Sequence, residues 1–140
     1  MIHPPVETIR ISEEAKANLL VLKRRTGISQ WNILCRWAVC ASLADSKPVV
    51  ATPKGEQSNV EIAWSTFGGQ HADVYTSLIH ARCHQDRLGN DSHTLAEQFR
   101  LHLERGLLKL RSREDTRSLE GLLSLVDNGL AGTSSNGASF

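Results

Sequence analysis

Residues 7–43, ETIRISEEAKANLLVLKRRTGISQWNILCRWAVCASL, predict a short strand followed by two helices. Polar and apolar side chains alternate over residues 8–11, as a strand with one buried face requires. Ser12 is the expected N-cap of the first helix, with acidic residues in the first turn at the positive end of the helix dipole. Gly27 can adopt the left-handed conformation that usually ends a helix, so we expect the first helix to stop there.

The apolar residues of both expected helices recur at helical spacing. Ala15, Leu19 and Leu22 lie on one stripe of the first helix. Ser29 is expected to cap the second helix, whose inner face is expected to carry Ile33, Trp37, Ala38 and Ala41. The resulting unit of strand, helix, glycine turn and helix resembles ribbon-helix-helix and helix-turn-helix DNA-binding modules in outline.

The segment 44–59 concentrates proline, glycine, serine and charge, which is typical of an exposed connection. It is longer than most loops of a compact domain, and such loops are often functional or mobile. Residues 60–64 alternate again and predict a second strand, with the 8–11 strand as its expected partner. Since a two-stranded ribbon is marginal in water, we expect it to pack on helices or to join strands of another protomer.

Two further helices are expected before the chain loses its pattern. Apolar positions between residues 72 and 88 predict a third helix that stops at Gly89-Asn90. Asp91 or Ser92 can cap a fourth helix, with a stripe at near-heptad spacing that suits packing against another helix: Leu95, Phe99, Leu103, Leu107 and Leu110. We therefore expect one helical domain over residues 1–111, then a short helix and a disordered tail over 112–140.

The chain has 140 residues and a formal net charge of only +1. A globally basic nucleic-acid binder is therefore excluded, and electrostatic binding must come from uneven placement of charge. The placement is uneven, because residues 1–40 and 99–117 are net basic while residues 41–98 carry more acids than cations.

The cysteine pattern and the apolar runs bound the compartment. Three cysteines, Cys35, Cys40 and Cys83, lie in helical patterns, and the N-terminus has no secretory signal, so we expect reduced thiols in the cytoplasm. Cys35 and Cys40 lie among apolar residues and are expected to be inert core fillers. The apolar runs are far shorter than the ~20 residues of a spanning helix, so no membrane role is expected.

The sequence carries weak or absent signals for catalysis and cofactors. HARCH at 80–84 places two histidines on one helical face, but further metal ligands at suitable spacing are missing. No phosphate-binding loop, nucleophile elbow or paired metal-binding carboxylates occur. We therefore expect a protein that is not an enzyme and that holds neither a metal nor a cofactor.

Three short stretches carry a resemblance to a known family. LKRRTGI at 22–28, WN at 31–32 and LCRWAVCASL at 34–43 resemble DndE, the small subunit of the bacterial DNA phosphorothioation machinery. The resemblance implies a mainly α, ribbon-helix-helix-related domain with short β-strands that forms a homo-oligomer and binds double-stranded DNA, with a preference for nicked duplex. It also implies that a cysteine desulfurase, DndC and DndD carry out the sulfur chemistry.

The candidate DNA contacts are cations near the first helix and on the loop after the second. Adjacent cations at the end of the first helix, Lys23, Arg24 and Arg25, suit phosphates, although they also compensate the helix dipole. Lys16 lies two turns earlier on the same helical face. The loop can add its own lysines only if it folds back, which completes the set: Lys16, Lys23, Arg24, Arg25, Lys47 and Lys54.

The expected assembly is a tetramer, because a single patch of cations binds weakly and symmetry multiplies it. Two other functions stay open. The chain can instead be a scaffold whose ligands are DndC and DndD, with the basic corner docking on an acidic protein surface. It can also be a ribbon-helix-helix transcriptional repressor, which would prefer one operator over unrelated DNA.

Overall fold

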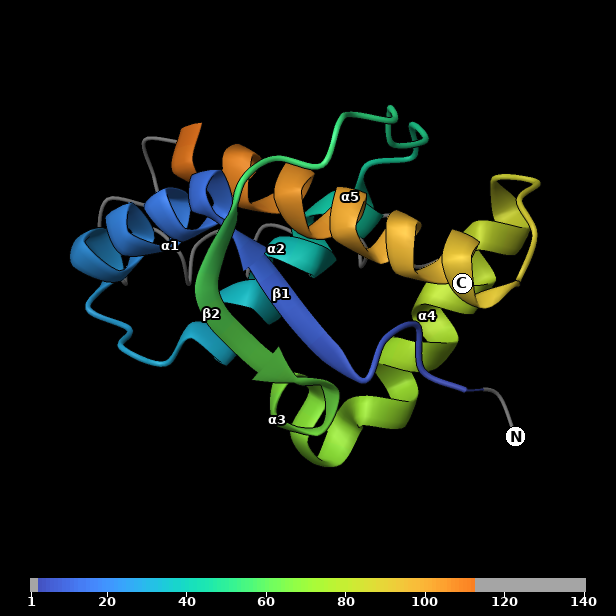
Figure 1. The fold of residues 1–140 in the computed structure, drawn as a ribbon, viewed down its shortest axis with the longest axis horizontal. Helices are drawn as coiled ribbons and strands as arrows, with labels where there is room; N and C mark the ends of the chain where they lie inside the picture. The colour runs from blue at the N-terminus through green and yellow to red at the C-terminus, as the bar shows by residue number, and fades with distance from the viewer. Residues whose placement is uncertain (1–2, 113–140) are drawn as a thin grey trace, which may run out of the picture.

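The computed structural model describes residues 3–112, which form a two-stranded ribbon with helices packed on one of its faces (Figure 1). The fold is mainly helical with short strands, as predicted. In chain order the elements are β1 (Thr8–Ser12), α1 (Glu13–Thr26), α2 (Trp31–Ala44), β2 (Gln57–Ala63), α3 (Trp64–Gly68), the 3₁₀ turn η1 (Gly69–His71), α4 (Ala72–Gln85) and α5 (Ser92–Ser112).

The ribbon consists of β1 and β2 in antiparallel pairing, which confirms the predicted partnership. Ile9 lies opposite Ile62 and Arg10 lies opposite Glu61. The isoleucines face the core, whereas Arg10 and Glu61 form an ion pair on the outer face. β2 begins earlier than predicted, and Trp64 opens α3 instead of ending the strand. The ribbon packs on helices of its own chain, one of the two outcomes that its small size predicts.

The signals for α1 operate as the sequence predicts. Ser12 caps the helix, because its Oγ accepts a hydrogen bond from the backbone N–H of Ala15 at 3.1 Å. Gly27 ends it at φ 75°, in the left-handed region that an L side chain adopts only with strain. Leu19 and Leu22 are fully buried, as their stripe requires.

The inner face of α2 differs from the prediction by one position. The fully buried side chains are Leu34, Cys35, Ala38, Val39 and Ser42, whereas Ile33, Trp37 and Ala41 are only half-buried. Ser29 is exposed and does not cap the helix, whose N-cap is Gln30 without a side-chain bond.

The partner of α2 explains which face is buried. α5 crosses α2 with Gly106 against the backbone of Ala38, so closely that a Cβ on Gly106 would lie 1.7 Å from the Ala38 carbonyl oxygen. This contact turns the row of Ala38 toward the core. A single helix cannot reveal it, because the sequence of α2 is apolar over most of its circumference.

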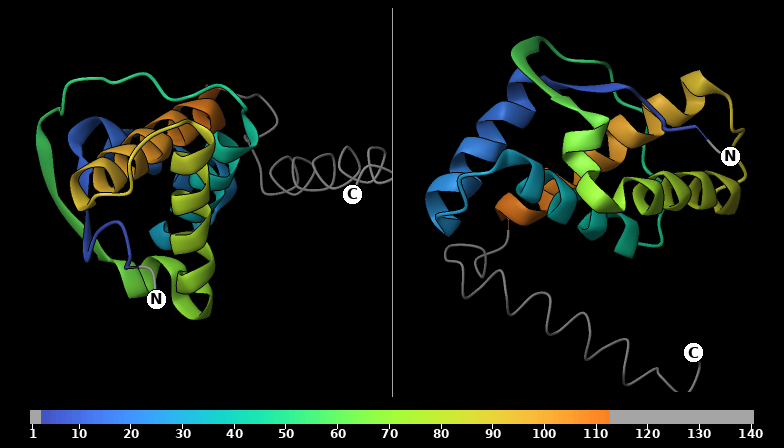
Figure 2. Two further views of the ribbon diagram at one scale, coloured as in Figure 1. Left: turned by 90° about the vertical axis from the view of Figure 1, so that its right-hand side faces the viewer. Right: turned by 90° about the horizontal axis from the view of Figure 1, so that it is seen from below.

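α5 is the longest described helix and its predicted stripe is confirmed. The side chains of Leu95, Phe99, Leu103, Leu107 and Leu110 are all buried. Asp91 caps the helix, since its Oδ2 accepts from the backbone N–H of Thr94 at 3.1 Å. Figure 2 shows α4 at a steep angle to α5.

α4 ends earlier than the predicted stop at Gly89-Asn90. The helix ends at Gln85, and Arg87 rather than Gly89 takes the left-handed conformation, with φ 62°. Glycine is the residue that usually tolerates such a backbone, so Gly89 was the natural candidate. The expected short helix around Leu119–Val126 and the expected tail lie outside the described residues.

Candidate nucleic-acid interface

The last turn of α1 carries the three adjacent cations predicted as DNA contacts. Lys23 and Arg24 are exposed, and Arg25 is half-buried. Nη1 of Arg25 donates a hydrogen bond to the backbone carbonyl of Arg111 at 2.6 Å. That contact joins the C-terminal end of α1 to the C-terminal end of α5, the light-blue and orange helix ends in Figure 1.

A second contact crosses between the same helices in the opposite direction. Nη1 of Arg111 donates to Oδ1 of Asn18 at 2.7 Å, and Asn18 is only 4% exposed. Four cations therefore gather where the two helices end, and we call Lys23, Arg24, Arg25 and Arg111 the basic end. Sequence reasoning missed Arg111: the positive charge of residues 99–117 was visible, but only the packing of α5 beside α1 brings it to this surface.

The other candidate cations lie outside the basic end. Lys16 is half-buried two turns before Lys23, and its Nζ donates to Oδ1 of Asn59 on β2 at 3.3 Å. Lys47 and Lys54 are exposed, and within residues 3–112 neither side chain forms a hydrogen bond or ion pair with the basic end. Of the six predicted contacts, only the three adjacent cations at the end of α1 belong to the basic end, where they lie near Arg111.

Lys54 borders a shallow hollow of about 200 Å³ between β1 and α5. Phe99 contributes an apolar wall, and the charged lining includes Arg10, Arg100 and Glu97. Because acids and cations alternate around this hollow, it offers no uniform positive potential for a phosphate.

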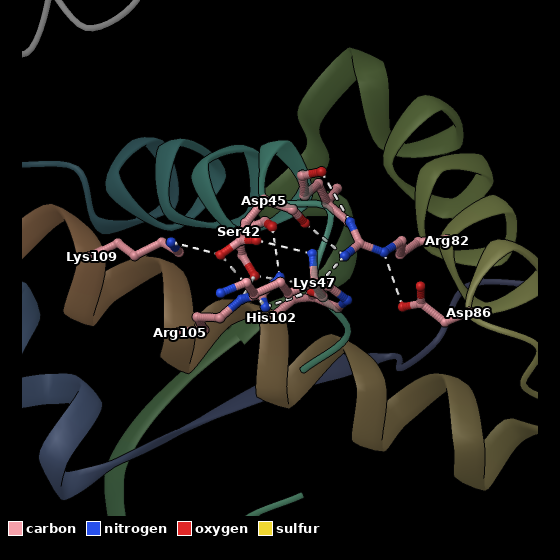
Figure 3. A network of polar contacts seen from close by, with 9 residues as sticks. Ser42, Asp45, Lys47, Arg82, Asp86, His102, Arg105 and Lys109 are labelled. Carbon is pink, nitrogen blue, oxygen red and sulfur yellow. Dashed lines mark hydrogen bonds and ion pairs between the residues drawn. The ribbon is translucent and has the colours of Figure 1, made fainter. Parts of the chain in front are cut away.

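In three other arginines, every guanidinium nitrogen already has at least one hydrogen-bond partner inside the fold. Arg82 is 5% exposed; its Nε binds Asp86, and its other nitrogens donate to carbonyls at the end of α2 and in the following loop (Figure 3). Arg105 donates to Ser42 Oγ, the Ser42 carbonyl and the Lys47 carbonyl. Arg100 is held in the same way by Glu97, Glu104 and the Thr52 carbonyl.

These bonds also determine the state of the loop over residues 45–56. The loop is exposed as predicted, yet its backbone is held at Lys47 by two arginines and at Thr52 by a third. Lys109 pairs with Asp45 at 2.8 Å at the start of the loop. The loop is therefore tied to α4 and α5, and it is not a free arm that carries its lysines to a ligand.

The charges around this network shift two pKa values. The hydrogen bond from Lys109 and the backbone bond at Lys47 lower the pKa of Asp45 to about 2. Burial lowers the pKa of His102 to about 4, and nearby Arg82 and Arg105 add to this shift. His102 Nδ1 lies 2.8 Å from Ser42 Oγ. This cluster is a structural assembly at the end of α2.

The cysteines divide into two kinds. Cys35 is fully buried, and burial raises its pKa to about 12, which agrees with an inert core thiol. Cys40, expected to share that role, is exposed because α2 buries the neighbouring row. Cys83 is buried.

The described residues contain no group of side chains arranged as a metal site. Within residues 3–112, no group of three histidine, cysteine, aspartate or glutamate side chains is placed to hold an ion. His80 of the HARCH segment instead contacts the backbone carbonyl of His3 at 3.0 Å.

The family model described as DNA sulphur modification protein DndE matches residues 8–118, which span every described strand and helix. The chain belongs to the DndE family. No curated protein sequence matches it significantly. As a member of the DndE family the chain takes part in DNA sulfur modification. None of the helices within residues 3–112 is long and apolar enough to cross a membrane.

Proposed function

We propose that this DndE-family chain is a non-catalytic, DNA-binding subunit of the bacterial DNA phosphorothioation complex. Its basic end contacts the phosphate backbone of a duplex, and DndC, DndD and a cysteine desulfurase carry out the sulfur chemistry. The observation that carries the proposal is a difference between the arginines. Three have all their guanidinium nitrogens engaged inside the fold, whereas Arg25 and Arg111 at the basic end each donate through one nitrogen only within the described residues.

The chemistry of the basic end suits phosphate rather than base edges. Lys23 and Arg24 are exposed on a helix end, and their side chains make no hydrogen bond or ion pair within residues 3–112, so they can meet phosphates without breaking a bond of the fold. Each phosphate that they neutralise releases condensed cations and steepens the salt dependence of binding by about 0.9 log units per log unit of salt. Such contacts position a duplex but carry no sequence information.

Assembly into a homo-oligomer, a tetramer in our proposal, multiplies this small site. A single basic end gives weak binding, whereas several copies on one duplex bind with avidity if their spacing permits simultaneous contact. Exposed apolar side chains on α4, Val74 and Leu78, provide surface that protomers can bury away from the basic end. A ribbon-helix-helix relationship of the β1–α1–α2 unit fits the same proposal.

A preference for nicked duplex has a physical reason that needs no base recognition. A nick makes the helix easier to bend at one point, and a symmetric array of basic ends gains contacts when the duplex bends toward it. The lower deformation energy then appears as tighter binding to nicked DNA.

The test is a double charge reversal, Lys23→Glu with Arg24→Glu, because both side chains are exposed and the fold does not depend on them. We expect loss of binding to a labelled random-sequence duplex, nicked or intact, with unchanged native mass and only a small loss of thermal stability from glutamates at a helix C-terminus. Wild-type affinity in the variant contradicts the proposal. So does an oligomer that buries residues 16–25 between its copies, which native mass spectrometry with cross-linking detects.

The scaffold alternative draws on the exposed apolar side chains of α4. Val74 and Leu78 lie one helical turn apart and are 53% and 40% exposed, so they suit an apolar partner surface. If the chain binds DndC and DndD but binds no DNA at low salt, the scaffold replaces the DNA-binding subunit. A repressor is recognised by unequal competition between one operator and unrelated DNA.

A further inference from the structure

The two hydrogen bonds between α1 and α5 at the basic end hold Arg25 and Arg111 in place, which Lys23 and Arg24 are not. Arg25 and Arg111 each donate one hydrogen bond through Nη1 to an acceptor on the other helix. Arg25 on α1 donates to the Arg111 carbonyl on α5, and Arg111 donates to Asn18 on α1. Their remaining guanidinium N–H groups have no partner among the described residues. Each side chain is therefore held in place while most of its donor fork stays open.

We propose that Arg111 is a further contact to the DNA backbone, that it acts beside Arg25 as a pre-anchored pair, and that Asn18 positions it. This inference rests on the proposed function and names a residue and an anchor that the sequence did not suggest. The fork of a guanidinium matches two phosphate oxygens at once, which a lysine ammonium does not.

Pre-anchoring matters because an arginine loses rotamer freedom when it binds. Ordering a long side chain at an interface costs conformational entropy, and a side chain that the fold already orders avoids part of that cost. Arg111 is held by Asn18 at 2.7 Å, and Asn18 is itself fixed by burial in the α1–α5 contact. The free side chains of Lys23 and Arg24 bear the full cost when they bind.

A helix C-terminus attracts cations by itself, so charge compensation is the competing explanation. Both α1 and α5 end here, and both have basic last turns. Compensation alone predicts that Arg111 stabilises the fold and leaves DNA affinity unchanged. The two explanations therefore differ in a measurable quantity.

The decisive measurement is the affinity of the full-length protein for a labelled nicked duplex across a salt series. Arg111→Ala is compared with Arg87→Ala, a matched control that also removes one exposed arginine but lies in the turn after α4. We expect Arg111→Ala to weaken binding roughly five- to tenfold and to reduce the salt slope by about 1. The control should stay within about twofold of wild type.

A second variant keeps the test valid if loss of Arg111 disturbs the fold. Asn18→Asp has the same shape and retains the acceptor, so the bridge between the helices persists while the new carboxylate neutralises the guanidinium. We expect weaker DNA binding without loss of thermal stability.

The outcomes separate this inference from the proposed function. If Arg111→Ala and Asn18→Asp both bind like the control while the Lys23 and Arg24 reversal abolishes binding, the role of Arg111 is wrong and the proposed function stands. If the wild-type protein itself does not bind DNA at low salt, both fall.

Discussion

Gly106 lies directly against the backbone of Ala38, with no room for a side chain between α5 and α2. A Cβ at Gly106 would approach the Ala38 carbonyl oxygen to 1.7 Å and its carbonyl carbon to 2.3 Å. Backbone atoms cannot move aside as a flexible side chain can, so these helices would have to separate.

Gly106→Ala should therefore destabilise the protein by about 3 kcal/mol or more, the upper end of the range for overpacking. The urea midpoint measures this change. Gly55→Ala is the matched control, because a Cβ there meets nothing within 4 Å, and it should change stability by less than about 0.5 kcal/mol. An equal midpoint for the two variants would show that α2 and α5 do not pack this closely.

Arg82→Ala should be the most destabilising arginine substitution within the described residues. It leaves the buried carboxylate of Asp86 without its partner and removes donors from three backbone carbonyls. Removal of one partner of a buried ion pair costs about 3–5 kcal/mol. Arg87→Ala removes an exposed side chain that makes no hydrogen bond or ion pair within residues 3–112, so it should leave the unfolding transition nearly unchanged. Comparable losses in both variants would contradict the structural role of Arg82.

How far the sequence predicted this architecture depends on the range of each signal. Ser12, Gly27 and the stripe of α5 act within a few residues, and each predicted its element correctly. The burial of α2 depends on Gly106, more than sixty residues away, and the sequence therefore pointed to the neighbouring row. Glycine has a low helix propensity, yet Gly106 lies within α5 at the close contact with Ala38.

The candidate site follows the same rule. Lys23, Arg24 and Arg25 are adjacent in the chain, so sequence reasoning grouped them and the structure keeps them on one helix end. Arg111 joins them only through bonds between α1 and α5, which no local pattern encodes. The formal net charge gives no help in locating this surface, because it counts an arginine whose nitrogens are all engaged inside the fold equally with one that faces solvent.

Acid should destabilise the fold in two separate windows. The pKa of His102 is about 4 in the fold and 6.5 in the unfolded chain, so the unfolded state binds the extra proton first. Stability should fall by ~3 kcal/mol as pH drops from about 6.5 to 4. Below that, protonation of Asp45, whose pKa is lowered to about 2, removes its contribution as well.

His102→Gln isolates the first window. The variant lacks the titrating ring, so its unfolding free energy should vary little between pH 6.5 and 4, whereas wild type should show a clear slope. Chemical denaturation at closely spaced pH values measures both. A variant with the wild-type slope would assign the effect to other groups.

One of the three thiols should react in the native state. Burial raises the pKa of all three thiols, that of Cys35 to about 12, so accessibility decides which one reacts: Cys40 is exposed on α2, whereas Cys35 and Cys83 are buried. Alkylation at mildly basic pH followed by peptide mass mapping should label Cys40 first and the other two only after unfolding. Cys40→Ser should abolish native labelling; equal labelling of Cys35 would contradict the burial of its row on α2.

The tethered loop over residues 45–56 has a practical consequence for anyone who engineers the protein. Its composition marks it as a convenient place to insert an epitope or to expect protease cleavage. Its carbonyl oxygens, however, accept hydrogen bonds from Arg82, Arg100 and Arg105, so an insertion there would leave arginine donors on two helices without their acceptors. This loop, the longest non-helical stretch between described elements, therefore links α4 to α5. Sites that tolerate an insertion should be sought elsewhere.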